Sequence, residues 1–173
     1  GLYLHFKAIA ESVSIPVIVY NVPSRTGVDI PVSVYGRLSE IPNIAGVKEA
    51  SQDITKTLQI RAECAPDFAV WSGNDDMAVP VMSMGGLGVI SVVSNVAPVE
   101  TQAMAQAALA GDFDTAAALQ AKLLPLIRLL FCEVNPIPVK AAMKLLGFDC
   151  GGCRLPLSSM TDINYRKLAE YLH

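Results

Sequence analysis

The chain has 173 residues, of which 52% are hydrophobic and 17% are charged, and its formal net charge is -3. This composition is too apolar for a disordered chain, and an acidic balance without a basic cluster argues against nucleic-acid binding. No apolar run reaches the roughly 18 residues that span a bilayer, and no charged start precedes a cleavable apolar segment. A soluble cytoplasmic protein of one domain is the simplest interpretation, well short of the about 250 residues of a complete (β/α)8 barrel.

Hydrophobic patterning predicts strands separated by helices over the first part of the chain. Apolar residues at helical spacing predict a helix over residues 1–13, and a run rich in β-branched residues predicts a buried strand over 15–22. Further strands are expected at 43–51, 68–72 and 89–93, and further helices at 31–38, 54–64 and 77–84. About four strand-helix units of this kind predict an α/β fold with a parallel sheet.

The last part of the chain has a helical pattern throughout. Helices are expected at 98–109, from a cap at Asp112 to about 131 with Pro125 inside, at 135–147 and at 162–172. The expected organisation is therefore residues 1–97 as strand-helix units and 98–173 as helices, with no Gly/Ser linker between them.

Lys48 is the first candidate for chemistry, near the end of the apolar run 43–51. Period-two alternation places it on the same face as Gly46 and Ala50, so its side chain is expected to point into a core. An ammonium there is costly unless it is paired or loses its proton, and a lysine with a lowered pKa is a nucleophile that forms imines with carbonyl substrates. The alternative is a lysine that extends to solvent or pairs with Glu49.

Tyr20 is the last inward residue of the preceding strand, on the same face as Pro16 and Ile18. The spacing from Tyr20 to Lys48 fits one strand-helix repeat, and adjacent parallel strands lie about 4.8 Å apart, so both side chains are expected at the same end of the sheet. A phenol beside an activated amine can relay the protons that imine formation requires. The alternative is a tyrosine that only fills the core, with its hydroxyl hydrogen-bonded.

Arg25 follows the first strand, in a loop with Pro23, Ser24 and Gly27. Barrel enzymes place substrate-binding groups in the loops after the carboxyl ends of strands. The planar guanidinium suits a carboxylate, which makes Arg25 a candidate binding residue, although a solvated loop arginine is the alternative.

Two polar motifs later in the chain have structural explanations that we prefer. Asp75 and Asp76 could suggest metal ligands, but the histidines or further carboxylates of such a set are missing nearby, and a cap of the following helix explains them better. The glycines in 85–88 precede a strand, whereas a phosphate-binding loop follows a strand and opens a helix, so a tight turn is expected there.

Cys150 and Cys153 have the spacing of a redox pair or of half a zinc site. No second pair completes a tetrahedral set, and the only histidines are His5 and His173. Free, reduced thiols flanking a glycine turn are therefore expected, and no metal site is predicted.

Four motifs in order along the chain carry a resemblance to a known family: YNVPSRTG at 20–27, GVKEA at 46–50, GNDD at 73–76 and GVIS at 88–91. Together they resemble dihydrodipicolinate synthase, one of the pyruvate-dependent class I aldolases related to N-acetylneuraminate lyase. The segment Ser24 to Gly27 favours the synthase over its lyase relatives, because the family uses that arginine to hold the carboxylate of the aldehyde substrate.

The resemblance implies a fold, a reaction and a set of site residues. The chain would be the carboxy-terminal half of a (β/α)8 TIM barrel with a helical subdomain, part of a homotetramer, and would lack the amino-terminal half. Lys48 would form the Schiff base with pyruvate, Tyr20 would relay protons, Arg25 would bind aspartate semialdehyde, and Ile90 would contribute its backbone to the pyruvate site. No metal or organic cofactor is implied, and the pathway is lysine and diaminopimelate biosynthesis.

The expected half-barrel also lacks parts that the family uses. A threonine pair that grips the pyruvate carboxylate and a second tyrosine from a neighbouring subunit belong to the absent strands, so the chain alone is expected to be inactive. Two alternatives remain open from the sequence. One is a related pyruvate aldolase, of the N-acetylneuraminate or 2-keto-3-deoxygluconate type, and the other is a non-catalytic half-barrel that acts as an assembly module.

Overall fold

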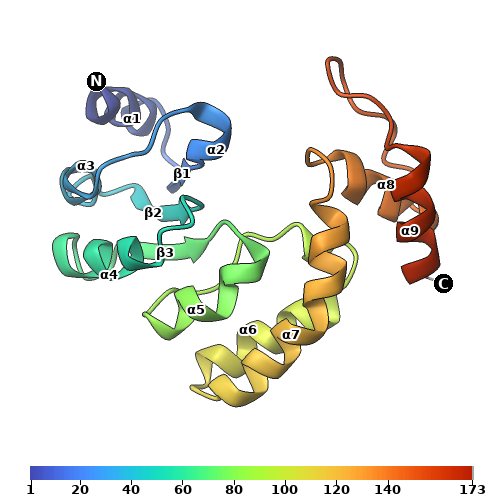
Figure 1. Cartoon of the computed structure of the whole chain (residues 1–173). Coiled ribbons are helices and arrows are strands. Elements are labelled where there is room, and N and C mark those ends of the chain that lie inside the picture. Colours follow the sequence, from blue (N-terminus) through green and yellow to red (C-terminus); the bar gives the residue numbers. More distant parts are fainter. Residues whose placement is uncertain (173) are drawn as a thin grey trace.

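The computed structural model describes residues 1–172 and contains a three-stranded parallel sheet, helices packed on one face of that sheet, and a group of helices that follows it (Figure 1). The strand order is β1 (Val17–Asn21), β2 (Ile44–Glu49) and β3 (Ala69–Ser72). The sheet is open, so the structure is an α/β arrangement in which no barrel is closed within the described residues.

The helices alternate with the strands and then continue alone. Those of the first part are α1 (Leu2–Glu11), α2 (Pro23–Thr26), α3 (Val32–Leu38), α4 (Ile54–Glu63), the 3-10 turn η1 (Asp75–Met77) and α5 (Ala78–Ser83). Those of the second part are the 3-10 turn η2 (Val93–Asn95), α6 (Pro98–Leu109), α7 (Phe113–Leu130), α8 (Ile137–Leu145) and α9 (Asp162–Leu172). Among residues 1–172, no helix is long and apolar enough to cross a membrane.

One face of the sheet forms the first hydrophobic core. Val19, Val47 and Val70 occupy equivalent positions on the three strands and are almost completely buried against helices. The helices contribute the residues that pack on them, which are Ala10, Tyr35, Leu38, Ile60 and Val81. Because strand side chains alternate between faces, the residues between these valines lie on the opposite face, which none of the described helices covers.

Gly46 explains why β2 and β3 can approach closely. A Cβ added at this position would lie 2.1 Å from the carbonyl oxygen of Ala69, a distance that only movement of the backbone could relieve. Gly46 is also where the register of β1 on β2 shifts, between the pairs Val17 with Ile44 and Ile18 with Gly46. The glycine therefore sets the spacing of the strand that carries Lys48.

A second hydrophobic core lies among the helices of the last part of the chain, with α6 packed along α7 (Figure 1). Asp112 caps α7 as predicted, since its Oδ1 accepts a hydrogen bond from the backbone N–H of Thr115 at 3.0 Å. The predicted helices at 98–109 and 162–172 have the observed bounds, and the others differ by a few residues at their ends.

The predicted strand at 89–93 is wrong over most of its length. Val89 forms only a single parallel bridge to Ser72, and the chain then turns into η2 at Val93. The backbone N–H groups of Val92 and Val93 donate to the carboxylate of Asp75, which removes them from any strand ladder. Residues 1–172 thus contain three strands and a bridge in place of four strands.

Candidate active site

Lys48 and Tyr20 lie side by side on the uncovered face of the sheet. They are partners in the register of β1 and β2, and the Lys48 Nζ lies 4.3 Å from the centroid of the Tyr20 ring, within cation–π range. Trp71 on β3 is the partner of Lys48 on its other side. The predicted proximity of Lys48 and Tyr20 is confirmed.

The prediction that Lys48 points into a core needs correction. The helices cover only the opposite face, so Lys48 is partly exposed and Tyr20 is 42% exposed. Tyr20 therefore does not simply fill the core, which was the alternative for that residue. Within the part of the chain that the structure describes, the amine and the phenol lie on an open surface.

The pKa of Lys48 is lowered from its ordinary value. Partial burial of the ammonium is the largest cause, because desolvation disfavours the charged form. The negative charge of Asp75 acts in the opposite direction, and the positive charge of Arg25 adds to the lowering. The balance increases the share of the neutral amine, which is the nucleophilic form.

Glu49 does not pair with Lys48, which excludes one alternative for the lysine. As the next residue along β2, Glu49 points to the covered face and is buried there. Its carboxylate accepts hydrogen bonds from Asn21 Nδ2 at 3.0 and 3.1 Å, from the Tyr35 hydroxyl at 3.2 Å and from the Ser51 N–H at 2.7 Å. Within residues 1–172, Lys48 forms no ion pair.

These contacts belong to a polar cluster on the covered side of the sheet, which the sequence did not reveal. Lys56, almost fully buried on α4, pairs with Asp29 and lies 3.9 Å from Glu49 Oε2. Asn21 joins the same carboxylates, and its Oδ1 accepts from the backbone N–H of Ile30 at 3.1 Å. Because Asn21 and Glu49 are register partners directly after Tyr20 and Lys48, this cluster fixes the two strand ends that bring the tyrosine to the lysine.

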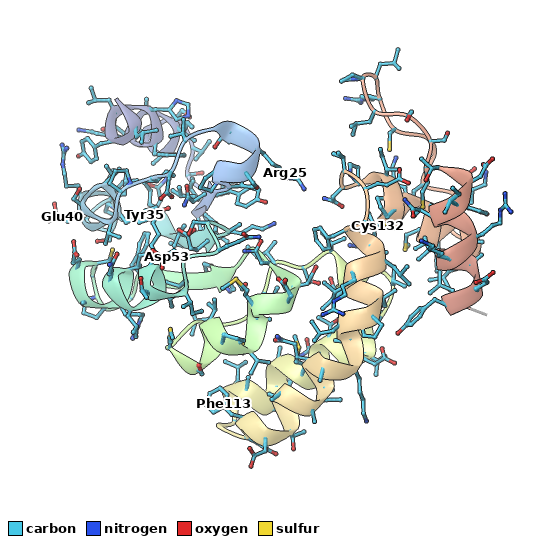
Figure 2. The ribbon with its side chains drawn as sticks, in the orientation of Figure 1. Arg25, Tyr35, Glu40, Asp53, Phe113 and Cys132 are labelled. Atoms are coloured by element: carbon cyan, nitrogen blue, oxygen red, sulfur yellow. The ribbon has the colours of Figure 1, made fainter. Side chains whose placement is uncertain are left out.

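Tyr35 closes the cluster from α3 and lies between that helix and the strands (Figure 2). Burial, followed by the neighbouring charge of Glu49, raises the pKa of Tyr35 well above its usual range. The side chain is therefore a neutral hydrogen-bond donor. The sequence did not indicate that Tyr35 would be hydrogen-bonded to Glu49. Its burial in α3 does agree with the helical spacing of apolar residues in that segment.

Arg25 lies in α2, directly after β1, where a loop was expected. The segment forms one helical turn that begins at Pro23 and ends at Gly27, whose φ of 68° is in the left-handed region that favours glycine. The exposed Arg25 extends from α2 toward the side of the molecule where α7 ends (Figure 2), and its Nη1 donates to the carbonyl of Asn135 at 3.5 Å. The structure thus places Arg25 at the same sheet end as Tyr20, between that end and the α7–α8 connection.

Ile90 lies at the same sheet end. Its backbone N–H donates to the carbonyl of Ser72 at 2.9 Å, so this segment is bound to the carboxyl end of β3. The predicted capping role of Asp75 or Asp76 is wrong, because η1 and α5 have no side-chain cap and the Asp75 carboxylate binds the N–H groups of Val92 and Val93.

The described residues contain no metal-ligand cluster, since no three His, Cys, Asp or Glu side chains between residues 1 and 172 gather as a metal site would require. Cys150 and Cys153 are free thiols, as predicted. They flank a loop in which Gly151 has a φ of 65° and in which Lys140 Nζ donates to the carbonyls of Cys150 and Gly152, each at 2.8 Å.

Comparison with known proteins agrees with this arrangement. The Dihydrodipicolinate synthetase family model matches residues 1–173. The chain belongs to this family. Among its relatives, the 4-hydroxy-tetrahydrodipicolinate synthase of Caldicellulosiruptor saccharolyticus is 52% identical over 172 residues, covering 99% of this chain and 58% of that protein. The enzyme of the same name from Methanosarcina mazei is 51% identical and is covered over 60% of its length.

Solved structures of dihydrodipicolinate synthases are also similar to this chain. The Aquifex aeolicus enzyme has a TM-score of 0.96 at 44% identity, over 99% of this chain and 59% of that one. The Acinetobacter baumannii enzyme, solved in complex with pyruvate, has a TM-score of 0.91 at 42% identity over the same shares. The chain thus spans about 60% of the length of the relatives that it matches, and its open sheet corresponds to part of their fold.

Proposed function

We propose that this chain is the carboxy-terminal half of a 4-hydroxy-tetrahydrodipicolinate synthase. Residues 1–97 would form the second half of the TIM barrel and 98–173 its helical part. The observation that supports this function best is the position of Lys48 Nζ over the Tyr20 ring at the end of adjacent parallel strands. The names of relatives at about half identity support the same activity.

In the proposed reaction, Lys48 is the nucleophile. Its neutral amine attacks the ketone carbon of pyruvate, and the resulting carbinolamine loses water to give an imine. Loss of a methyl proton converts the imine to an enamine, whose carbon attacks the aldehyde carbon of aspartate semialdehyde. The amino group of that adduct then attacks the imine carbon, which closes the ring and releases the Lys48 amine.

In this proposal, Tyr20 transfers protons in these steps. The carbinolamine must gain a proton on its leaving oxygen, and the phenol of Tyr20 lies beside the amine that forms it. A positioned proton-transfer group commonly contributes about 10² to 10⁴ in rate.

Arg25 and Ile90 would bind the substrates. The Arg25 guanidinium would present paired donors to the carboxylate of aspartate semialdehyde, because its exposed position after β1 leaves donors accessible besides the Nη1 group that reaches Asn135. The backbone of Ile90, held on the end of β3, would contribute to the pyruvate site. The remaining pyruvate contacts, and assembly as a homotetramer, would require the other half of the barrel.

A joined protein tests this function. Connecting the amino-terminal segment of the Caldicellulosiruptor saccharolyticus relative to this chain should complete the barrel, because the two proteins are 52% identical over the shared part. We expect this protein to condense pyruvate with aspartate semialdehyde, and we expect the same protein with Lys48→Ala to show no condensation above background. Release of pyruvate from N-acetylneuraminate or 2-keto-3-deoxygluconate, without condensation, would contradict the synthase assignment and favour the related aldolases.

A further inference from the structure

Asp75 is a buried carboxylate that the proposed reaction does not use. It lies at the start of η1, directly beyond β3, and only 3% of its surface is exposed. Its Oδ2 accepts the backbone N–H of Val92 at 2.9 Å and that of Val93 at 3.2 Å. One oxygen of Asp75 therefore ties the segment after Ile90 to the end of β3.

The other oxygen of this carboxylate has no protein partner. Asp75 Oδ1 is buried without a hydrogen bond in the structure of residues 1–172. A buried carboxylate with an unsatisfied oxygen costs free energy unless a positive charge or a donor compensates for it. A cation or a hydrogen-bond donor that interacts with Asp75 would offset this cost.

The cation adjacent to the Asp75 segment is Lys48. A Cβ added to Gly73 would lie 3.2 Å from Lys48 Cγ, so the chain between β3 and Asp75 runs directly against the lysine side chain. The Asp75 charge raises the pKa of Lys48 and opposes the effects of burial and of Arg25.

Few other charged or titratable groups face Lys48. Tyr20 comes from β1, Arg25 from α2 and Asp75 from η1, while the β3 neighbour, Trp71, is uncharged. Glu49 points to the opposite face of the sheet. Asp75 thus supplies a negative charge from the segment that runs against Lys48.

We propose that Asp75 is a positioning residue for Lys48, which fixes the 90–93 segment with one oxygen and supplies the counter-charge of the lysine and of its imine. This inference rests on the proposed function in one respect, which is that Lys48 forms the imine. A protonated imine is a better electron acceptor than a neutral one, and a fixed negative charge nearby stabilises that cation. Asp75 would therefore stabilise the protonated, more reactive form of the imine. The same negative charge would reduce the share of Lys48 that is a neutral amine before pyruvate binds.

Asp75→Asn removes the negative charge of the side chain and keeps its size and shape. The amide oxygen can still accept from the Val92 and Val93 N–H groups, but the negative charge is lost. The matched control is Asp76→Asn, which removes one charge from the exposed neighbouring residue. Lysines of the 173-residue chain can be reductively methylated with ¹³C-formaldehyde and titrated by NMR, with the Lys48 signal assigned by its absence in Lys48→Arg.

We expect the Lys48 titration to move to lower pH in Asp75→Asn and to stay in place in Asp76→Asn. An unchanged titration in Asp75→Asn, or an equal shift in both variants, would overturn the electrostatic role. If Asp75→Asn does not fold, Asp75→Ser decides the question in the same way, because it also lacks the charge and keeps a hydroxyl acceptor.

Amide hydrogen exchange tests the positioning role separately. Asp75→Ala removes the carboxylate that accepts from both N–H groups, so it should accelerate exchange at Val92 and Val93 by more than about tenfold, while Asp75→Asn should retain most of the protection. Unchanged exchange in Asp75→Ala would overturn this role. Neither readout uses pyruvate, so a chain that fails to form an imine would contradict the proposed function without deciding the role of Asp75.

Discussion

The two faces of the sheet come from alternate residues of the same three strands, yet their surroundings differ completely. On the covered face, Val19, Val47 and Val70 are almost inaccessible to solvent, and a cluster around Glu49 satisfies the polar groups. On the uncovered face, Ile18 and Tyr20 are 44% and 42% exposed.

The two faces of each strand therefore have different roles. The covered face holds the strands in register through Asn21 and Glu49. The residues immediately before these two, Tyr20 and Lys48, lie on the uncovered face, where their functional groups are accessible. Stability and reactivity are therefore expected to respond to different substitutions on the same strand.

Covering the open face should have the largest effect. A closed barrel removes sheet edges and surrounds the inner side chains, and three strands cannot do this alone. We expect no synthase turnover from the 173-residue chain and, because apolar residues line the open face, self-association in sedimentation experiments. The barrel joined to the Caldicellulosiruptor saccharolyticus segment is the control. A folded monomer of the chain alone with near-normal turnover would refute this expectation.

Tyr20→Phe should reduce turnover far more than it reduces stability. The ring keeps its contacts, and Tyr20 is 42% exposed, so the free energy of unfolding should change by less than about 1 kcal/mol. Loss of the phenol should lower the turnover of the joined barrel by about 10² to 10⁴. Equal turnover in the variant and the parent, measured by the condensation assay, would remove Tyr20 from the proton relay.

A pair of isoleucines tests the two faces by stability. Ile60 of α4 is fully buried against the covered face, and Ile18 lies on the uncovered face. We expect Ile60→Ala to lower the free energy of unfolding by about 2–5 kcal/mol and Ile18→Ala to lower it by less than about 1 kcal/mol. Urea unfolding of the 173-residue chain measures both, at a concentration below that at which the chain self-associates. Similar losses for the two variants would show that the uncovered face is buried in solution.

The smallest expected effect is the loss of stability at low pH that Asp29 causes. Hydrogen bonds from Lys56 and Asn21 lower the pKa of Asp29 below its ordinary 3.8, so the ionised carboxylate stabilises the folded chain above that pH. This contribution is lost as the pH falls through the lower pKa of the folded state. Because Asp29 is largely exposed, we expect less than about 1 kcal/mol. Asp29→Asn should thus be less stable than the parent at pH 7, and the difference measured by urea unfolding should shrink as the pH falls below 3.8.

Local patterns were enough to predict most of the elements and the central pair. The β-branched runs before Tyr20 and Lys48 gave both strands, and parallel geometry then placed the two side chains together. The cap at Asp112 was predictable for the same reason, since its partner, Thr115, lies three residues away.

Contacts between distant segments explain what the sequence did not reveal. Asp75 resembles a helix cap in its local context, but its partners, Val92 and Val93, lie on another segment, and this contact also ends the expected fourth strand. The Glu49 cluster joins residues from two strands and two helices, and none of them indicates the others by spacing. Which face of the sheet is covered depends on the packing of whole helices, and period-two alternation does not distinguish the two faces.

Trapping the imine on the uncovered face is the most direct measurement. The joined barrel is incubated with pyruvate and borohydride, digested, and examined by mass spectrometry, with Lys48→Ala treated in parallel. We expect one pyruvate-derived addition on the peptide that contains Lys48, and none in the variant, because the lysine with the lowered pKa beside Tyr20 is the proposed nucleophile. Labelling of a different lysine, or labelling that persists in Lys48→Ala, would contradict the assignment of the uncovered face as the reactive one.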